Sequence, residues 1–290
     1  MITALIDGDW ILYAAGFAGQ KAELVCPTAF GDKTFKNITE IRKAWESWGK
    51  EGETPPVYRR DVLDPETHFY HSAKMMIQRN CEKIEEKFRE EVEPVVLIDG
   101  DGNFRSRIAT IRPYKGTRSV HAKPIFYNNI RQYLLDAWAA EVIHEQETDD
   151  EMAIRQTAFN NQGQKCIIVG VDKDMLQVPG WHLNPNKGFK TISRQEGLER
   201  LYVQCISGDT VDNIGGAYKF GPVAAKRMIM GKNLSEVVMW ERVLSAYAQS
   251  IKMHGNELYG GLNAAEAALE NMRLVFLRRI PGEQWNPPEV

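Results

Sequence analysis

The sequence predicts an α/β fold built on a central, mostly parallel sheet flanked by helices. Three short apolar runs are each followed by two acids one residue apart. Residues 2–6 precede Asp7-Gly-Asp9, residues 94–98 precede Asp99-Gly-Asp101, and residues 165–171 precede Asp172-Lys-Asp174. Buried parallel strands are continuous apolar runs, and open α/β sheets bind ligands beyond the carboxyl ends of their strands. The repeated pattern therefore predicts one acidic site at one edge of the sheet.

Composition is that of an ordinary globular protein. The 290 residues suggest one or two domains, and 43% hydrophobic and 26% charged residues are usual for a soluble chain. The net charge of −3 argues against a polycation that coats nucleic acid along its whole length. The scattered cysteines predict reduced core residues rather than disulfides or zinc ligands: Cys26, Cys81, Cys166 and Cys205. Without a long apolar run or a signal peptide, we expect a cytoplasmic protein that does not contact membranes.

Helices and further strands fill the chain between the acidic runs. Residues 65–91 carry apolar side chains at helical spacing, which predicts a core helix. Residues 23–36 predict a hairpin turning at Gly31-Asp32, followed by a helix capped by Thr39 whose tryptophans pack locally. Later patterns predict a helix from Lys123-Pro124, strands at 142–147 and 181–184, helices capped by Thr148 or Asp149 and by Ser193, and C-terminal helices at 235–253 and 263–277.

A basic, aromatic stretch follows the second acidic run. Residues 103–131 contain no Asp or Glu. They carry Arg105, Arg107, Arg112, Lys115, Arg118, Lys123 and Arg131, interleaved with Phe104, Tyr114, His121 and Tyr127. Basic groups suit a phosphate backbone, and aromatic rings suit unstacked bases. We interpret the stretch as a nucleic-acid contact, and the alternative is a solvated basic face.

Residues 208–227 combine acids with a helix start. Asp209 and Asp212 are spaced to share one face of a helical turn. Gly215-Gly216 predicts a turn, and Gly221-Pro222 predicts the start of a helix that carries Lys226 and Arg227. A cation beside a helix start that holds a phosphate is one interpretation. The other is a polar helix–loop–helix with incidental acids.

Together the acids predict a metal site. The candidate ligands at strand ends and helix starts are Asp7, Asp99, Glu147, Asp149, Asp150, Asp172, Asp174, Asp209 and Asp212. Two such charges ~4 Å apart repel by ~4 kcal/mol at an effective dielectric constant of about 20. All-oxygen donors select Mg²⁺ or Mn²⁺, and two ions can stabilise both oxygens of a phosphoryl displacement. For 147–151 alone, acids that complement a helix dipole are the alternative.

These motifs resemble, in order from residue 1 to about 230, the flap endonuclease / 5′-nuclease family and especially the 5′–3′ exonucleases of tailed bacteriophages. The matching motifs are Leu-Ile-Asp7-Gly-Asp, Leu-Ile-Asp99 with Phe104-Arg105, Pro113-Tyr-Lys115-Gly-Thr-Arg118, Glu147-Thr-Asp149-Asp150, Val-Asp172-Lys-Asp174 and Gly208-Asp209-x-x-Asp212-Asn-Ile. The resemblance implies a nuclease core over 1–205 and a helix–three-turn–helix region with C-terminal helices over 206–290.

The resemblance also implies roles for single residues. Asp7, Asp99, Glu147, Asp149 and Asp150 would surround one ion, and Asp172, Asp174, Asp209 and Asp212 a second. Lys115 and Arg118 would act in catalysis from a basic helical arch over about 103–123. We assign DNA contacts to Arg105, Arg107, Arg112, Tyr114, Lys123, Lys219, Gly221, Lys226 and Arg227. The family's helix–three-turn–helix often binds K⁺, but here Lys219 replaces the first glycine of its turn and Gly215 replaces a common proline.

The sequence thus predicts a metal-dependent 5′–3′ exonuclease or flap endonuclease. Its partners would be DNA with 5′ ends or flaps and RNA–DNA hybrids, in the host-cell cytoplasm if a phage encodes it. Two alternatives remain open. A catalytically silent DNA-binding protein would keep the basic stretch, and a haloacid-dehalogenase-like phosphatase would use Asp7 as its nucleophile.

Overall fold

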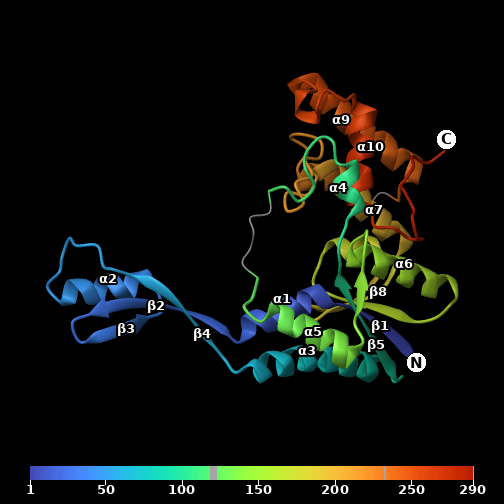
Figure 1. Cartoon of the computed structure of the whole chain (residues 1–290). Helices are drawn as coiled ribbons and strands as arrows, with labels where there is room; N and C mark the ends of the chain where they lie inside the picture. The colour runs from blue at the N-terminus through green and yellow to red at the C-terminus, as the bar shows by residue number, and fades with distance from the viewer. Residues whose placement is uncertain (118–122, 232, 290) are drawn as a thin grey trace. The chain divides into compact units, whose positions relative to one another are not determined.

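The structure, a computed structural model, describes residues 1–117, 123–231 and 233–289 (Figure 1). The chain forms two compact units, which are described separately here. The larger unit contains Met1–Trp10, Ile77–Ala122 and Leu134–Val290, and the smaller contains Ile11–Met76 and Lys123–Tyr133. These units do not correspond to the two regions implied by the resemblance, 1–205 and 206–290. That functional division stays a prediction.

The larger unit is built on a six-stranded sheet with the order β6-β5-β1-β7-β8-β9. Every neighbouring pair is parallel except β8 and β9. The strands are β1 (Ile2–Asp7), β5 (Val92–Asp99), β6 (Glu141–Ile143), β7 (Cys166–Val169), β8 (Gly180–Asn184) and β9 (Gly188–Ile192). With helices packed on this sheet, the predicted α/β class is confirmed.

The three predicted acidic strands are neighbours in this sheet. β1 lies between β5 and β7, and Ile6 pairs with Val96 on one side and Val169 on the other. β5 and β6 are added on one side of β1, and β7 and β8 are later added on the other side. The strand order therefore reverses at β1. Such a switch point is where open α/β sheets form ligand crevices. The topology therefore brings the acids after β1, β5 and β7 to one edge.

Helices cover the sheet and the site edge. α6 (Thr148–Asn161) packs against β1, β5 and β7. Its N-cap is Glu147, whose side chain forms a capping box with Asp150, so the predicted caps Thr148 and Asp149 are one or two residues late. α1 (Gly8–Ala18), α3 (Glu66–Phe88) and α5 (Tyr127–Trp138) each contribute residues to both units. The short α4 (Phe104–Ile108) follows β5.

The C-terminal helices share a second core. They are α7 (Arg194–Ser207), α8 (Pro222–Ile229), α9 (Glu236–His254) and α10 (Ala264–Val275). Ser193 caps α7 as predicted, and Pro222 is the first residue of α8. Ser235 and Asn263, where the two predicted C-terminal helices begin, are the N-caps of α9 and α10. Fully buried Tyr202, Tyr247 and Met272 lie in the core between these helices. Gly255–Gly261 contains a single 3₁₀ turn, Glu257–Tyr259.

The turn before α8 differs from the prediction. Asp209 and Asp212 do not lie on a helix. The chain closes a tight loop in which Asp209 and Ile214 exchange backbone hydrogen bonds of 2.9 and 2.7 Å. The Asp209 carboxylate accepts the backbone N–H groups of Val211 and Asp212, at 2.8 and 3.4 Å. This local bonding competes with helix formation, which is a common property of aspartate.

The smaller unit contains a three-stranded antiparallel sheet in the order β3-β2-β4 (Figure 1). β2 (Gln20–Thr28) and β3 (Gly31–Phe35) form the predicted hairpin, but it turns at Ala29-Phe30, two residues early. α2 (Ile38–Ser47) is capped by Asn37 instead of Thr39, and its Ile41 and Trp45 pack on Cys26. β4 (Tyr58–Leu63) was not predicted, because all its residues are exposed and it lacks an apolar face.

The cysteines and the helix lengths were also the subject of expectations from the sequence. The cysteines of the described residues are all free, and Cys26, Cys166 and Cys205 are buried, as expected for reduced core residues. Across the described ranges, no helix combines the length and apolar character needed to cross a membrane.

Gly8 tests how tightly the β1–α1 junction is packed. A Cβ at this position would lie 2.5 Å from the backbone oxygen of Leu97, which cannot move without disturbing β5. We expect Gly8→Ala to lower the free energy of unfolding by about 1–3 kcal/mol, the usual cost of overpacking. Gly221→Ala is the control, because its Cβ would have no neighbour within 4 Å. Equal denaturant midpoints for the two variants would contradict this packing.

Candidate active site

The acids at the ends of β1 and β5 are tied together by backbone hydrogen bonds. The Trp10 N–H donates to Asp7 Oδ1 at 3.0 Å, and the Asp99 N–H donates to Asp9 Oδ2 at 2.7 Å. The Thr148 N–H, at the start of α6, donates to Asp99 Oδ1 at 2.7 Å. Two strand ends and one helix start are thereby joined at one point of the sheet edge.

These carboxyls repel one another. Burial, followed by the charges of Asp99 and Asp172, raises the pKa of Asp7 to about 6. Burial and the charge of Asp99 raise the pKa of Asp9 to about 7. Burial raises the pKa of Asp149 well above its usual value, with further contributions from Asp7 and Asp172. The first group of acids therefore carries more negative charge than its surroundings compensate.

A second group follows β7 and precedes α8. Asp172 Oδ1 accepts the Asp174 N–H at 2.7 Å. Burial and the charges of Asp172 and Asp209 raise the pKa of Asp174 to about 7. Burial opposes ionisation of Asp209, but the Val211 N–H and the Lys173 ammonium, 3.4 Å from its Oδ2, lower its pKa overall. Asp172 acts on Asp7 and Asp149 as well as on Asp174, so it links the two groups electrostatically.

Tyr114 and Lys115 reach the acids from the basic stretch. The Tyr114 hydroxyl donates to Asp212 Oδ2 at 2.9 Å and lies 3.1 Å from Glu147 Oε2. The Lys115 ammonium donates to Glu147 Oε1, and the Lys115 N–H donates to the Asp212 backbone oxygen at 2.9 Å. Burial opposes ionisation of Glu147, but Lys115 and Arg105 lower its pKa. Burial and Glu147 raise the pKa of the Tyr114 hydroxyl, which keeps it a donor.

Lys115 adopts an unusual backbone conformation. Its φ of 56° lies in the left-handed region, where a side chain other than glycine costs roughly 1–2 kcal/mol. Strain of this kind is commonly retained where a side chain must reach a functional site. Lys115 lies in a turn, not on a helix, and the only helix in the described part of 103–117 is α4. Arg118 and the end of the predicted arch, 118–122, fall outside the described residues.

A pocket of about 120 Å³ collects most of these groups. The acids that line it are Glu147, Asp149, Asp172, Asp174, Asp209 and Asp212, together with Tyr114, Lys115 and Lys173. The donors are carboxylate oxygens, which suit hard divalent cations. Burial and neighbouring carboxylates raise the pKa values of Asp149 and Asp174, which shows that these two acids have too little positive charge around them. As the side chains stand, no group of three or more Asp, Glu, His or Cys among the described residues is arranged to coordinate an ion. The donors thus fit a divalent cation chemically, and coordination requires some of them to rotate.

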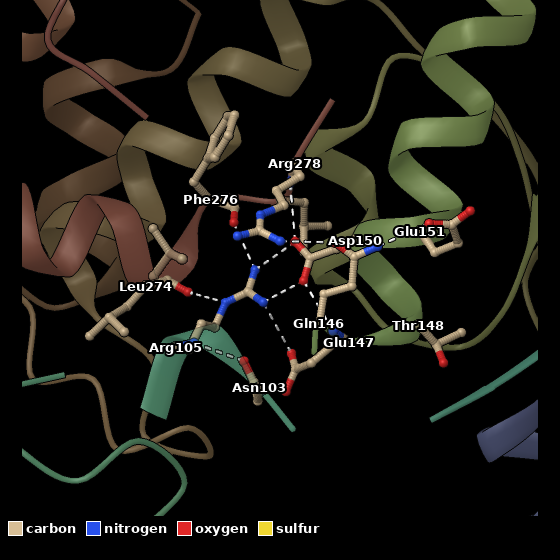
Figure 2. A network of polar contacts seen from close by, with 12 residues as sticks. Asn103, Arg105, Gln146, Glu147, Thr148, Asp150, Glu151, Leu274, Phe276 and Arg278 are labelled. Atoms are coloured by element: carbon tan, nitrogen blue, oxygen red, sulfur yellow. Dashed lines mark hydrogen bonds and ion pairs between the residues drawn. The ribbon is translucent and has the colours of Figure 1, made fainter. Parts of the chain in front are cut away.

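Two of the predicted site residues instead form a buried ion pair (Figure 2). Asp150 is fully buried, and Arg105 is 1% exposed. Arg105 Nη1 and Nη2 lie 2.5 and 2.9 Å from the two Asp150 oxygens. Its remaining donors bind backbone oxygens of the C-terminal segment. The prediction that Arg105 contacts DNA is therefore wrong, and Asp150, whose carboxylate is occupied by Arg105, is no longer a candidate metal ligand.

The other predicted DNA contacts do not form a single cluster. Arg107 is exposed and pairs with Glu145, and the Arg112 guanidinium lies beside Gly215. Gly221 caps α8, and the last turn of that helix carries Lys226 and Arg227. Lys219 has a φ of 69° in the turn before α8. Lys123 belongs to the smaller unit, where its ammonium lies 4.3 Å from the ring centroid of Tyr127.

A groove of about 440 Å³ runs from α8 to the acids. Its lining includes Lys226 and Pro222 of α8, Arg200 of α7, and Lys173, Asp174 and Asp209 of the acidic site. The groove therefore connects a basic helix end with the second group of carboxylates. A phosphate backbone that follows it would reach those carboxylates.

Sequence reasoning missed Asp9 and Lys173 as site residues. Asp9 lies in the same Asp-Gly-Asp run as Asp7, and the repeated acid-x-acid pattern was the signal that could have identified it. Lys173 lies between Asp172 and Asp174, and its ammonium is 3.4 Å from Asp209 Oδ2. No pattern in the sequence indicates that pairing, because Asp209 is 36 residues away along the chain.

No protein-family model matches the chain, and no curated protein matches it. Solved structures similar to it include the bacteriophage T5 flap endonuclease in complex with DNA and metal ions, with 14% identity, a TM-score of 0.48, and coverage of 95% of this chain and 99% of that one. The T5 5′-exonuclease with bound zinc has 13% identity, a TM-score of 0.45, and coverage of 95% and 100%. The catalytic core of Rad2 in complex with DNA substrate has 15% identity, a TM-score of 0.43, and coverage of 98% and 84%.

The raised pKa values predict how pH and Mg²⁺ affect stability. A carboxyl with a raised pKa binds its proton more tightly in the folded than in the unfolded protein, so stability falls as pH rises from about 4 to about 7. We expect Mg²⁺ to raise the melting temperature at about pH 8 and to have little effect at about pH 5, where the carboxyls are protonated. At a metal concentration 100 times the dissociation constant, the gain is about 2.7 kcal/mol.

Buried His182 contributes a slope of the opposite sign. Burial lowers its pKa to about 4, so stability rises with pH between about 4 and 6.5. Because this contribution is independent of Mg²⁺, the difference between melting curves in Mg²⁺ and in chelator isolates the acidic site. The same Mg²⁺ effect at both pH values would contradict the prediction.

Proposed function

We propose that the chain is a divalent-metal-dependent nuclease that hydrolyses phosphodiesters near the 5′ ends of duplex DNA, by 5′–3′ exonuclease action and flap cleavage. RNA primers in hybrids are included as substrates. The observation that carries the proposal is the crowding of acids at the switch point of the parallel sheet, with the pKa values of Asp7, Asp9, Asp149 and Asp174 all raised. Perturbed acids of this kind gather at functional sites.

The carboxylates would hold Mg²⁺ or Mn²⁺ in two groups. We assign Asp7, Asp99, Glu147 and Asp149 to one group, and Asp172, Asp174, Asp209 and Asp212 to the other. When bound, two such ions supply a nucleophilic water and stabilise the attacking and leaving oxygens of an in-line displacement. Asp172 is best placed to serve both groups, because its charge acts on Asp7 and Asp149 in the first and on Asp174 in the second.

Lys115 would act on the scissile phosphate from within the pocket, and Tyr114 would hold two of the carboxylates. Both side chains line the pocket with the acids. The Lys115 ammonium, which is bound to Glu147 here, could turn toward a phosphate and neutralise the charge that develops on it. Tyr114 stays protonated and holds Glu147 and Asp212 through its hydroxyl. We retain Arg118 as a second catalytic cation on the strength of its sequence motif.

The groove beside α8 would guide the duplex. Lys226 of α8 lines the groove, and so do the carboxylates Asp174 and Asp209. Backbone N–H groups at the start of α8, where Gly221 caps the helix, suit a phosphate. Arg112, Lys219 and Arg227 would add contacts to the same strand, and a K⁺ ion in the turn before α8 belongs to this part of the proposal.

Asp172→Ala tests the active site. The side chain is exposed, so its removal should leave the fold intact. We expect Mg²⁺-dependent cleavage of 5′-end-labelled duplex and flap DNA to fall by more than about 100-fold, because loss of one charge-stabilising group commonly costs 10²–10³. DNA binding in chelator should be preserved.

Asp136→Ala is the matched control, because Asp136 is an exposed acid on α5 outside the pocket. Cleavage by Asp172→Ala at the parental rate would refute the site assignment. A parent protein that binds flap DNA but yields no product with any metal would instead favour the silent DNA-binding alternative.

Lys226→Ala tests the groove. A lysine that neutralises one phosphate contributes one released counterion, so the slope of log affinity against log salt should decrease by about 1. Lys252→Ala removes an exposed lysine from the last turn of α9, away from the groove, and should leave the slope unchanged. Fluorescence anisotropy with a labelled duplex over a salt series measures both slopes. Identical slopes for the two variants would exclude the groove as the duplex path.

A further inference from the structure

Arg105 uses its guanidinium to join two segments that are far apart in the sequence (Figure 2). Besides its two contacts with Asp150, Nε donates to the Leu274 backbone oxygen at 2.8 Å. Nη2 also donates to the Phe276 backbone oxygen at 2.7 Å. Arg105 Nη1 lies 3.7 Å from Glu147 Oε2. A single buried side chain thus joins the start of α6 to the end of α10 and the residue that follows it.

Other buried groups bind the same C-terminal segment through its backbone. Asp150 Oδ1 accepts the Arg278 N–H at 3.1 Å. Gln177, which is 2% exposed, donates from Nε2 to the Val275 oxygen at 3.0 Å and accepts the Leu277 N–H at 3.1 Å. Residues 274–278 are therefore fixed by three buried polar side chains, and each of these side chains bonds to main-chain atoms of the segment.

This arrangement borders directly on the acidic pocket. Leu274, Val275 and Leu277 line it together with the carboxylates. Asp150 is flanked on α6 by Asp149 and, three residues earlier, by Glu147, whose backbone N–H it accepts at 3.3 Å. Any shift of Asp150 must therefore move the two acids that α6 contributes to the pocket.

Stability alone is a weak reason for such an ion pair. Bringing two charges into a buried site costs several kcal/mol of solvation, and apolar residues of similar volume are often equally stable there. What apolar residues cannot reproduce is the direction of the four hydrogen bonds that the Arg105 guanidinium donates. Mutation of residues that hydrogen-bond to metal ligands commonly changes metal affinity or activity by 10- to 100-fold.

We propose that Arg105 is a positioning residue of the metal site: through Asp150 and the carbonyls of Leu274 and Phe276, it sets the orientation of Glu147 and Asp149 and holds the C-terminal segment as a wall of the pocket. This inference rests on the proposed function only in requiring that the pocket binds a divalent metal. It gives the last third of α10 and the segment after it a role in the chemistry of a site formed mainly by the sheet.

The test compares Arg105→Lys with Arg155→Lys in the full chain. Arg155, which lies on α6, also makes a two-point contact, with Glu141 at 2.8 and 2.6 Å, and it does not line the pocket. Titration calorimetry with Mn²⁺ alone should show 10- to 100-fold weaker binding for Arg105→Lys. Arg155→Lys should bind Mn²⁺ as the parent does. The Mg²⁺ concentration for half-maximal DNA cleavage should rise by the same factor in Arg105→Lys.

A double variant separates the effect of Arg105 on the orientation of the acids from its effect on the stability of the fold. Arg105→Met combined with Asp150→Leu removes both charges together, so its melting temperature should return toward that of the parent. Its Mn²⁺ affinity should stay low, because the hydrogen bonds that orient α6 are not restored. Parental Mn²⁺ affinity in either Arg105 variant would overturn the inference and leave the pair a purely structural role.

Mn²⁺ binding and DNA cleavage by the parent protein test the proposed function separately from the role of Arg105. If it binds Mn²⁺ but cleaves no DNA, the nuclease proposal fails, while the ratio of Mn²⁺ affinities between variant and parent still decides the role of Arg105. If the parent binds no Mn²⁺, both proposals are overturned.

Discussion

The structure depends on a concentration of negative charge that the fold itself creates. Because β5, β1 and β7 are parallel neighbours, their carboxyl ends and the acids that follow them share one edge. Backbone N–H groups stabilise these carboxylates one by one, as Trp10 does for Asp7 and Thr148 does for Asp99. Such bonds orient the oxygens but add no positive charge. The repulsion therefore remains, and it appears as raised pKa values.

The direction of the pKa shift separates two kinds of acid in one pocket. Glu147 and Asp209 have lowered pKa values. Lys115 and Arg105 outweigh the effect of burial at Glu147, and the Val211 N–H, followed by Lys173, outweighs it at Asp209. Asp149 and Asp174 line the same pocket and have raised pKa values, because burial raises them and the charges of other carboxylates add to its effect. The first kind is already compensated by the chain. The second kind lacks a cation, so it marks where an added ion would gain most.

The sequence predicted those elements whose structure is set by neighbouring residues in the chain. It did not predict elements whose structure depends on contacts with distant segments. The acidic strands were predicted, because an apolar run followed by an acid is a local pattern that the sheet then repeats. β4 and β9 were not predicted as strands, because their residues are polar or exposed and only pairing with a neighbour makes them strands. Asp209 and Asp212 have helical spacing, but the Asp209 side chain binds the next N–H groups and closes a turn instead.

The misassignment of Arg105 and Asp150 has a deeper cause. Each has the residue type that the site chemistry requires, and only burial distinguishes an arginine that pairs inside the protein from one that faces DNA. Arg105 also binds two main-chain carbonyls, that of Leu274 at the end of α10 and that of Phe276 just after it. Hydrogen bonds to the main chain do not require a particular side chain at those positions. The contribution of residues 274–278 therefore leaves no motif in the sequence. What the sequence does constrain there is apolar character, since Leu274, Val275 and Leu277 line the same pocket as the carboxylates. Apolar side chains lower the local dielectric constant and strengthen the interactions of nearby charges, so the C-terminal segment acts on the acids both through Arg105 and through its own apolar side chains.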